Sequence, residues 1–219
     1  MRLKLIVLFL GIFITTRLYA QQGFPFDNEI RAFKHQDSIN PPAKGGILFI
    51  GSSSIRKWTD LELRFAGKPI IRRGVGGCTL EQLVNYYTPY ILSPYQPRKV
   101  FIYAGENDIA AGKSGQFVFE EFEKLWTMIH QQLPVADIYF MSIKLSPSRA
   151  QSFNEVIKAN ELIKTYLVNK PRSTFIDVGA AILKGNSALP DSALFQEDML
   201  HLNSKGYDRW QQVLEPYVK

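Results

Sequence analysis

The sequence predicts an α/β fold in which a parallel sheet carries helices on both faces. Five apolar runs of strand length alternate with segments of helical periodicity. The first three runs each end in a loop of glycine and small polar residues. Such alternation is typical of parallel sheets, because a crossover between parallel strands needs room for a helix. A flavodoxin-like strand order of 2-1-3-4-5 is the simplest doubly wound arrangement.

The expected elements are short and are bounded by turn residues. Strands are predicted at residues 47–50, 69–72, 99–103, 137–143 and 173–178. Helices are predicted at residues 79–92, 115–133, 152–168 and 204–217. Thr59 and Glu62 also have the spacing of a capping box, which predicts a short helix after the first strand.

The first twenty residues have the layout of a secretory signal. Arg2 and Lys4 precede an apolar run, and Ala20 precedes a polar stretch. We therefore predict cleavage after Ala20 and export of the mature protein to the periplasm or the cell exterior. An uncleaved anchor stays open because Arg17 lies close to the cut, although the apolar run is short for a membrane span.

The mature chain is predicted to form one domain with a short extension. Residues 21–45 are a polar lead-in whose helix Asp27 could cap, and we expect it to pack on a domain formed by residues 46–219. The net charge of +6 falls to +3 once the signal and its three basic residues are removed. No dense basic block remains, which argues against nucleic acid as a partner.

Cysteine and histidine usage excludes several kinds of site. Cys78 is the only cysteine of the chain, so neither an intrachain disulfide nor a cysteine-based metal site can form. The three histidines, His35, His130 and His201, are widely separated and match no zinc spacing. The sequence therefore predicts no metal site.

Three loops are expected to meet at the carboxyl edge of the sheet, where open α/β sheets bind their ligands. They cover residues 51–54, 74–78 and 105–108 and contain serines in the first and Asn107 in the third. Each loop alone could serve only as a tight turn or a helix cap. Together they describe a site for an oxyanion, since acyl transfer needs a nucleophile and nearby hydrogen-bond donors.

The expected general base is His201, which lies three residues after Asp198 near the end of the chain. This spacing lets the carboxylate bind one ring nitrogen and leaves the other nitrogen for a serine hydroxyl. His35 lies in the lead-in and His130 within a helix, so neither is placed as well for this role.

The blocks Gly51-Ser52-Ser53-Ser54, Gly77, Gly105-Glu106-Asn107-Asp108 and Asp198-Met199-Leu200-His201, in this order, resemble the GDSL esterase/lipase family, also called SGNH hydrolases. The chain is most similar to small exported bacterial members related to platelet-activating-factor acetylhydrolase catalytic subunits. The resemblance extends from about residue 46 to residue 217 and implies a three-layer αβα fold without a cofactor.

The resemblance also implies a role for each matching residue. Ser53 would be the nucleophile, His201 the general base and then general acid, and Asp198 the residue that orients His201. The oxyanion hole would consist of the backbone N–H groups of Ser53 and Gly77 and the side chain of Asn107. One such donor typically lowers the barrier by about 3 kcal/mol.

Several positions depart from the family pattern. Ser52 replaces the usual aspartate, Arg72 stands where asparagine is common, and Cys78 follows Gly77 where serine or aspartate is commoner. We interpret Cys78 as a small packed residue, with a nucleophilic role as the alternative. Glu106 is a candidate substrate contact, with a solvated loop carboxylate as its alternative.

We expect an exported serine esterase that removes a short acyl group, acetyl in the first instance, from a small-molecule ester of a sugar or other polar alcohol. One alternative is a lipid-directed esterase, lysophospholipase or thioesterase, which a long apolar lid would favour. Another is a catalytically silent module that binds carbohydrate or phosphate. Such a module has no need for Asp198 and His201. The sequence does not define an oligomeric state.

Overall fold

The computed structural model describes residues 25–219, apart from the side chains at positions 87, 91 and 93, and the predicted signal segment 1–20 lies outside this range. Five strands form one sheet: β1 (Ile47–Gly51), β2 (Ile70–Gly74), β3 (Lys99–Tyr103), β4 (Asp137–Met141) and β5 (Ser173–Ile176). They lie in the order β2-β1-β3-β4-β5, and every neighbouring pair is parallel. The predicted fold class and strand order are confirmed.

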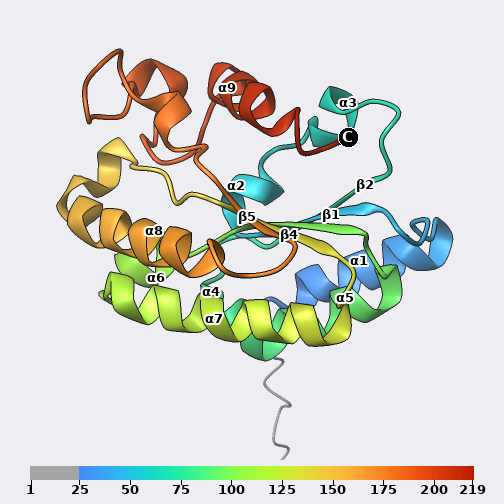
Figure 1. Ribbon diagram of the computed structural model, residues 1–219. Coiled ribbons are helices and arrows are strands. Elements are labelled where there is room, and N and C mark those ends of the chain that lie inside the picture. The colour runs from blue at the N-terminus through green and yellow to red at the C-terminus, as the bar shows by residue number, and fades with distance from the viewer. Residues whose placement is uncertain (1–24) are drawn as a thin grey trace, which may run out of the picture.

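Helices cover both faces of the sheet and make three layers (Figure 1). One face carries α1 (Asp27–Ile39), α4 (Leu80–Gln82), η1 (Leu83–Tyr87), α5 (Thr88–Tyr95), α7 (Gly115–Gln132) and α8 (Phe153–Leu167). The other face carries α2 (Ser53–Arg56), α3 (Leu61–Arg64), η3 (Ala180–Ile182), η4 (Ser192–Leu194) and α9 (Ser204–Leu214). Two short helices follow strand ends, α6 (Glu106–Ala110) after β3 and η2 (Pro147–Ser152) after β4.

The sheet separates two hydrophobic cores, because successive side chains of a strand point to opposite faces. In β1, Leu48 and Ile50 face the core under α7 and α8, whereas Ile47 and Phe49 face the core under α9. All four side chains are fully buried. This is why the strand is a continuous apolar run rather than an alternating one.

The predicted helix at residues 79–92 forms, but its geometry changes along its length. It begins with a capping box in which Thr79 and Gln82 bond each other's backbone N–H groups. A π-helical segment then precedes Pro89. Proline has no N–H to donate and its ring crowds the carbonyl four residues earlier, and a wider turn relieves both conflicts.

Neither capping residue predicted from the sequence, Thr59 or Asp27, caps its helix. Asp60 rather than Thr59 precedes α3, and its carboxylate accepts from Arg64 at 2.8 Å instead of capping the helix. Asp27 is the first residue of α1, not its cap, and accepts from Arg31 at 2.6 Å. In both cases an arginine one turn along the helix offers a charged donor, which competes with the backbone N–H.

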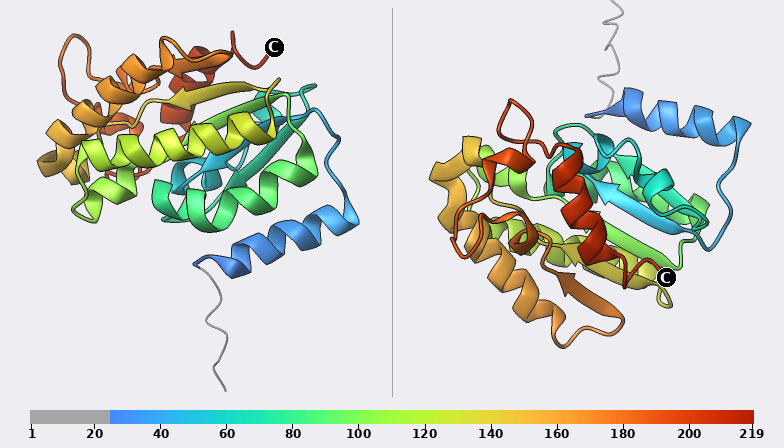
Figure 2. Two further views of the ribbon diagram at one scale, coloured as in Figure 1. Left: turned by 60° about the horizontal axis from the view of Figure 1, so that its bottom comes forward. Right: turned by 90° about the horizontal axis from the view of Figure 1, so that it is seen from above.

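The lead-in helix α1 lies outside the other helices and reaches the edge of the sheet at β2 (Figure 2). Ile30 is its one buried hydrophobic residue, and Asp37 pairs with Arg73 of β2. Among the helices of residues 25–219, none combines the length and apolar character that a membrane crossing requires.

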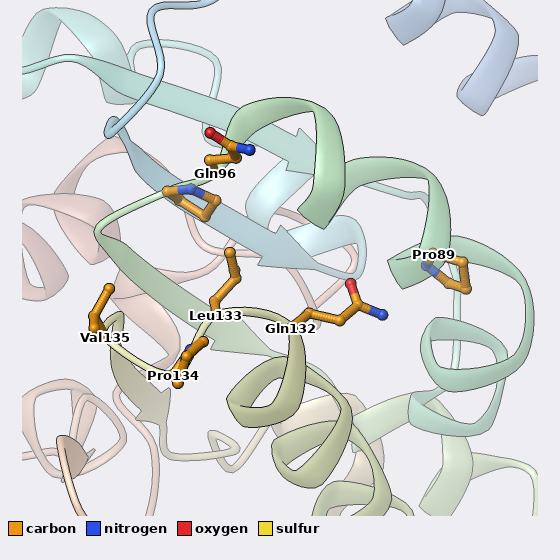
Figure 3. Close-up of a pocket in the computed structure, with 7 residues that line it drawn as sticks. Pro89, Gln96, Gln132, Leu133, Pro134 and Val135 are labelled. Carbon is orange, nitrogen blue, oxygen red and sulfur yellow. The ribbon is translucent and has the colours of Figure 1, made fainter.

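A hollow of about 660 Å³ opens at the amino edge of the sheet (Figure 3). Its lining includes Gln96 and Pro97, which precede β3, and Leu133 to Val135, which precede β4. These residues lie at the opposite edge from the glycine loops. The hollow is therefore separate from the candidate site described next.

Candidate active site

The carboxyl ends of β1, β2 and β3 are aligned, and they bring three loops to one edge. In the strand register Gly51 lies opposite both Gly74 and Tyr103. Only glycine fits at position 51, because a Cβ there would lie 1.9 Å from the Tyr103 carbonyl oxygen and φ is +145°. This close approach lets the chain turn sharply from β1 into α2.

Ser53 is the first residue of α2, directly after this turn. Ser52 precedes it in an extended conformation, so Ser53 begins the helix at the edge of the sheet. First-turn N–H groups of a helix have no acceptor within the helix, which leaves the N–H of Ser53 available for another partner. Tyr207 of α9 donates to the carbonyl of Ser54 at 2.9 Å and so holds α2 in place.

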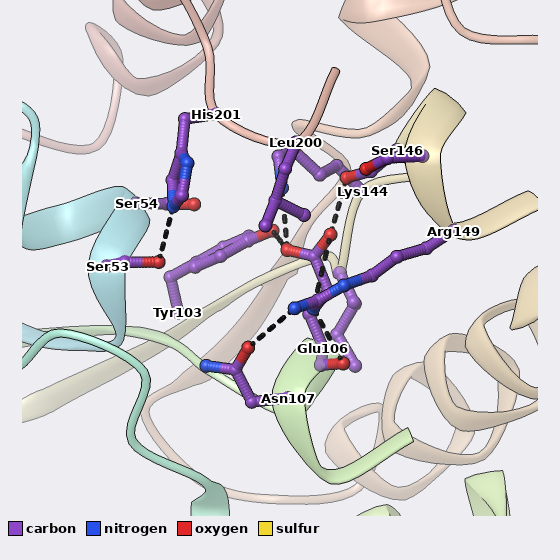
Figure 4. Close-up of polar contacts among 12 residues, drawn as sticks. Ser53, Ser54, Tyr103, Glu106, Asn107, Lys144, Ser146, Arg149, Leu200 and His201 are labelled. Carbon is purple, nitrogen blue, oxygen red and sulfur yellow. Dashed lines mark hydrogen bonds and ion pairs between the residues drawn. The ribbon is translucent and has the colours of Figure 1, made fainter. Parts of the chain in front are cut away.

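Asp198, His201 and Ser53 form a continuous chain of hydrogen bonds. Asp198 Oδ2 lies 2.6 Å from His201 Nδ1, and His201 Nε2 lies 2.9 Å from Ser53 Oγ. An ionised carboxylate can only accept, so the proton between Asp198 and the ring belongs to Nδ1. Nε2 is then free to accept the hydroxyl proton of Ser53 (Figure 4 labels Ser53 and His201).

A tight turn brings Asp198 and His201 together. The other carboxylate oxygen of Asp198 accepts the backbone N–H groups of Leu200 at 3.0 Å and His201 at 2.9 Å. Met199 between them has a φ of +52°, a left-handed conformation that costs energy for a side chain of this size. Two hydrogen bonds from Ser148 to the Met199 carbonyl, at 3.1 and 3.0 Å, hold it there.

The same turn determines the charge of Asp198. Partial burial alone would raise its pKa, but hydrogen bonds from the His201 ring and from the backbone N–H groups of His201 and Leu200 outweigh burial. The pKa of Asp198 therefore lies well below its usual range. Asp198 is ionised throughout the neutral range, as a residue that orients a histidine must be.

The other two sequence-predicted donors lie on the second and third loops. Gly77 has a φ of +79°, and a Cβ built there would meet nothing within 4 Å, so the space beside it is open. Asn107 Nδ2 donates to the carbonyl of Cys78 at 3.0 Å, which places the carboxamide next to the Gly77 loop. One N–H of this carboxamide is used in that bond, and the second remains for another acceptor.

Glu106 does not lie on a solvated loop. It is only 6% exposed, and its carboxylate pairs with Lys144 at 2.6 Å and accepts from Ser146 and from Tyr103. Burial would raise its pKa, but Lys144 and Ser146 lower it more. Its carboxylate thus binds protein donors, so the interpretation as a solvated loop carboxylate is wrong, and the role of Glu106 as a substrate contact stays a prediction.

Cys78 and Arg72, two of the three departures from the family pattern, have structural partners. The Cys78 thiol is buried and donates to the Gly51 carbonyl at 3.4 Å, and burial raises its pKa well above the usual value. A thiol held in the protonated state is a poor nucleophile. Arg72 binds Glu62 at 3.1 Å and the carbonyl of Arg56 at 2.8 Å, and so joins β2 to the α2–α3 segment.

Several residues support the loops without having been singled out in the sequence. Asp108 is buried and accepts the N–H of Leu80 at 2.9 Å, which ties the third loop to the start of α4. Glu29 of the lead-in helix accepts from Gly76 N at 3.2 Å and from Arg56 at 3.0 Å. The position of Asp108 inside the third block was the only sequence signal for Asp108 or Glu29.

Residues 25–219 hold no cluster of three or more acidic, histidine or cysteine side chains arranged to bind a metal ion.

The fold is a three-layer αβα arrangement, and its site holds a serine hydroxyl at a strand end with a histidine beside it. A family model described as GDSL-like lipase/acylhydrolase matches residues 50–209. The chain belongs to this family, as the resemblance implied. Among curated proteins no relative matches the sequence.

Several solved structures share this fold. A candidate platelet activating factor from Streptococcus pneumonia superposes with a TM-score of 0.78 at 21% identity, covering 88% of this chain and 92% of the other. A candidate acylhydrolase from Bacteroides fragilis gives 0.74 at 19% identity, covering 86% and 94%. An acetyl-xylooligosaccharide esterase from Geobacillus Stearmophilus gives 0.61 at 16% identity, covering 81% and 95%.

Proposed function

We propose that the protein is a serine esterase that removes short acyl groups, acetyl above all, from oxygen esters of carbohydrates or other polar alcohols. The observation that carries this proposal is the hydrogen-bonded series from Asp198 through His201 to Ser53, with distances of 2.6 and 2.9 Å. A module that only binds its ligand has no need for a histidine oriented in this way.

In the proposed reaction Ser53 Oγ attacks the ester carbonyl while His201 Nε2 takes the hydroxyl proton. The carbonyl oxygen becomes an oxyanion, which the N–H groups of Ser53, Gly77 and Asn107 would bind. Collapse of this intermediate breaks the bond to the alcohol, and His201 returns the proton to the leaving oxygen. The products of this half are an acyl-Ser53 and the free alcohol.

Water completes the cycle by the same steps. His201 takes a proton from a water molecule, whose oxygen attacks the acyl carbonyl. In the second tetrahedral intermediate the bond from the acyl carbon to Ser53 Oγ breaks, His201 returns its proton to Ser53 Oγ, and the carboxylic acid leaves. Asp198 keeps its charge throughout, because its hydrogen bonds hold its pKa far below neutral pH.

The preference for acetyl esters of sugars has its support in two structural neighbours. One is the acetyl-xylooligosaccharide esterase already described, and another is an acetyl esterase variant whose structure holds an acetate ion. Both are under 25% identical to this chain, so they support the choice of first substrates and no more.

We further propose that residues 1–20 are an export signal, which sequencing the amino terminus of the secreted protein would test.

The experiment is hydrolysis of p-nitrophenyl acetate, butyrate and octanoate by the protein without residues 1–20. Ser53→Ala and His201→Ala are measured beside it, with Ser38→Ala and His35→Ala as matched controls on the exposed lead-in helix. We expect acetate to be the preferred ester and only the first two variants to lose activity. A preference for octanoate would favour a lipid substrate, and a wild type no faster than Ser53→Ala would favour a binding module.

A further inference from the structure

The segment after β4, residues 146–149, contacts both the third loop and the turn from Asp198 to His201, although it contributes no group to the proposed reaction. Ser146 donates to the carboxylate of Glu106, a residue of the third loop. Ser148 donates to the carbonyl of Met199 in the turn between Asp198 and His201. Arg149 completes the set by binding the third loop itself. The segment is therefore anchored at both sides of the site.

The two terminal nitrogens of the Arg149 guanidinium donate hydrogen bonds to two successive residues of the third loop (Figure 4). Nη1 donates to the backbone carbonyl of Glu106 at 3.1 Å, and Nη2 donates to Oδ1 of Asn107 at 3.1 Å. Nη1 also lies 3.9 Å from the Glu106 carboxylate, which adds an electrostatic attraction. A planar guanidinium suits this task because its donors have a fixed relative geometry.

These contacts determine which way the Asn107 carboxamide faces. A cation on Oδ1 and the Cys78 carbonyl on Nδ2 exclude the flipped orientation, in which the NH₂ group would face Arg149. The charge also draws electron density toward Oδ1, and hydrogen bonds in series strengthen one another. The remaining N–H of Nδ2 thus becomes both fixed in direction and a better donor.

We propose that Arg149 is a positioning residue for the reaction, acting through Asn107 by orienting and polarising its carboxamide toward the oxyanion. This inference rests on the oxyanion role proposed above for Asn107. Because the donor matters most where negative charge develops, removing Arg149 should lower kcat more than it changes KM.

The test is a double-mutant cycle between Arg149→Met and Asn107→Ala, with p-nitrophenyl acetate as substrate. Arg172→Met is the matched control, since Arg172 pairs with Asp137 at 2.9 Å at the amino end of β5, away from the site. Arg149→Lys keeps the positive charge but cannot form both hydrogen bonds in the fixed geometry of a guanidinium. Thermal unfolding of each variant shows whether it folds.

We expect Arg149→Met to lower kcat about tenfold with KM within about twofold, and Asn107→Ala to lower kcat by about 10²-fold or more. In the Asn107→Ala background Arg149→Met should lower kcat by less than about twofold further, because the carboxamide through which Arg149 acts is absent. Arg149→Lys should recover part of kcat, and Arg172→Met should match wild type.

Two results would overturn the inference. The first is an equal loss from Arg149→Met in both backgrounds, which would mean that Arg149 acts independently of Asn107. The second is a rise in KM at constant kcat, which would make Arg149 a direct substrate contact. If Asn107→Ala alone left kcat unchanged, the oxyanion assignment itself would fail, so the two failures are distinguishable.

Discussion

Ser53 Oγ and His201 Nε2 lie 2.9 Å apart although 148 positions separate them in the chain. The contact joins the loop after the first strand to the turn before the last helix. It forms because α9 packs on the same face of the sheet as α2, where Tyr207 is hydrogen-bonded to Ser54. The packing of the second core therefore assembles the pair on which the proposed chemistry depends.

Replacing Asp198 by asparagine should lower kcat by about 10³- to 10⁴-fold. The neutral side chain no longer stabilises the imidazolium and can favour the wrong ring tautomer. The loss is measured with p-nitrophenyl acetate at neutral pH. Asp191→Asn, which changes the carboxylate that caps η4, is the control and should leave kcat unchanged. An Asp198→Asn variant with wild-type kcat would contradict the assigned role.

The lowered pKa of Asp198 also predicts how stability depends on pH. A carboxyl group with a lower pKa in the folded state stabilises the fold above its unfolded pKa of about 3.9 and loses that contribution as the pH falls further. The side chain is 41% exposed, so solvent screening keeps the effect small. In urea unfolding, the difference between wild type and Asp198→Asn should be present at pH 7 and shrink below about pH 4. A difference that grew on acidification would contradict this sign.

The lead-in helix should influence catalysis through Glu29. Its carboxylate binds Gly76 and Arg56, which flank the proposed oxyanion donor Gly77 and the nucleophile loop. Glu29→Ala should therefore lower kcat by roughly three- to tenfold, well below the loss expected for a direct donor. Asp27→Ala removes an ion pair on the same helix and is the matched control. Equal kcat for both variants and wild type would show that the lead-in only packs on the domain.

The pair of Glu106 and Lys144 should matter for stability. Lys144 is fully buried and lies 2.6 Å from Glu106, so removal of either partner leaves a charge in the interior. Lys144→Met should lower the free energy of unfolding by about 3 kcal/mol. Adding Glu106→Gln should restore part of this loss, since the uncompensated charge is then gone. Urea titration measures both, and a Lys144→Met variant as stable as wild type would refute the expectation.

Cys78 should be unreactive in the folded protein. Burial keeps its thiol protonated and out of solvent. Iodoacetamide at pH 8 should label it only after unfolding in urea, and Cys78→Ala should keep most of the esterase activity. Rapid labelling of the native protein, with matching loss of activity, would instead support the alternative of a cysteine nucleophile.

Features that depend on local pattern were predictable from the sequence. The strands, their order and the long helices followed from apolar periodicity and from the limits on crossover connections. The cap assignment at Asp27 was wrong because Arg31 binds its carboxylate, and the assignment at Thr59 was wrong because α3 begins one residue later, after Asp60. The π-helical turn before Pro89 replaces a regular helix for a reason that periodicity cannot report.

The supporting residues of the site could not be predicted in the same way. Arg149, Lys144 and Glu29 are distant in sequence from the residues that they bind. Their roles therefore depend on which loops the tertiary packing brings together. A charged residue in a loop usually faces solvent, which was the alternative to a substrate contact for Glu106. Its burial depends on Lys144, a residue 38 positions later in the chain, which neutralises its charge.

The role of Ser53 as the nucleophile is tested most directly by covalent labelling with diethyl p-nitrophenyl phosphate, followed by peptide mass spectrometry. This reagent phosphorylates an activated serine hydroxyl and releases p-nitrophenol. We predict one diethylphosphoryl group per chain, located on Ser53, with no labelling of Ser53→Ala and much slower labelling of His201→Ala. Labelling at another residue, or equal labelling of wild type and Ser53→Ala, would contradict the assignment of Ser53 as the nucleophile.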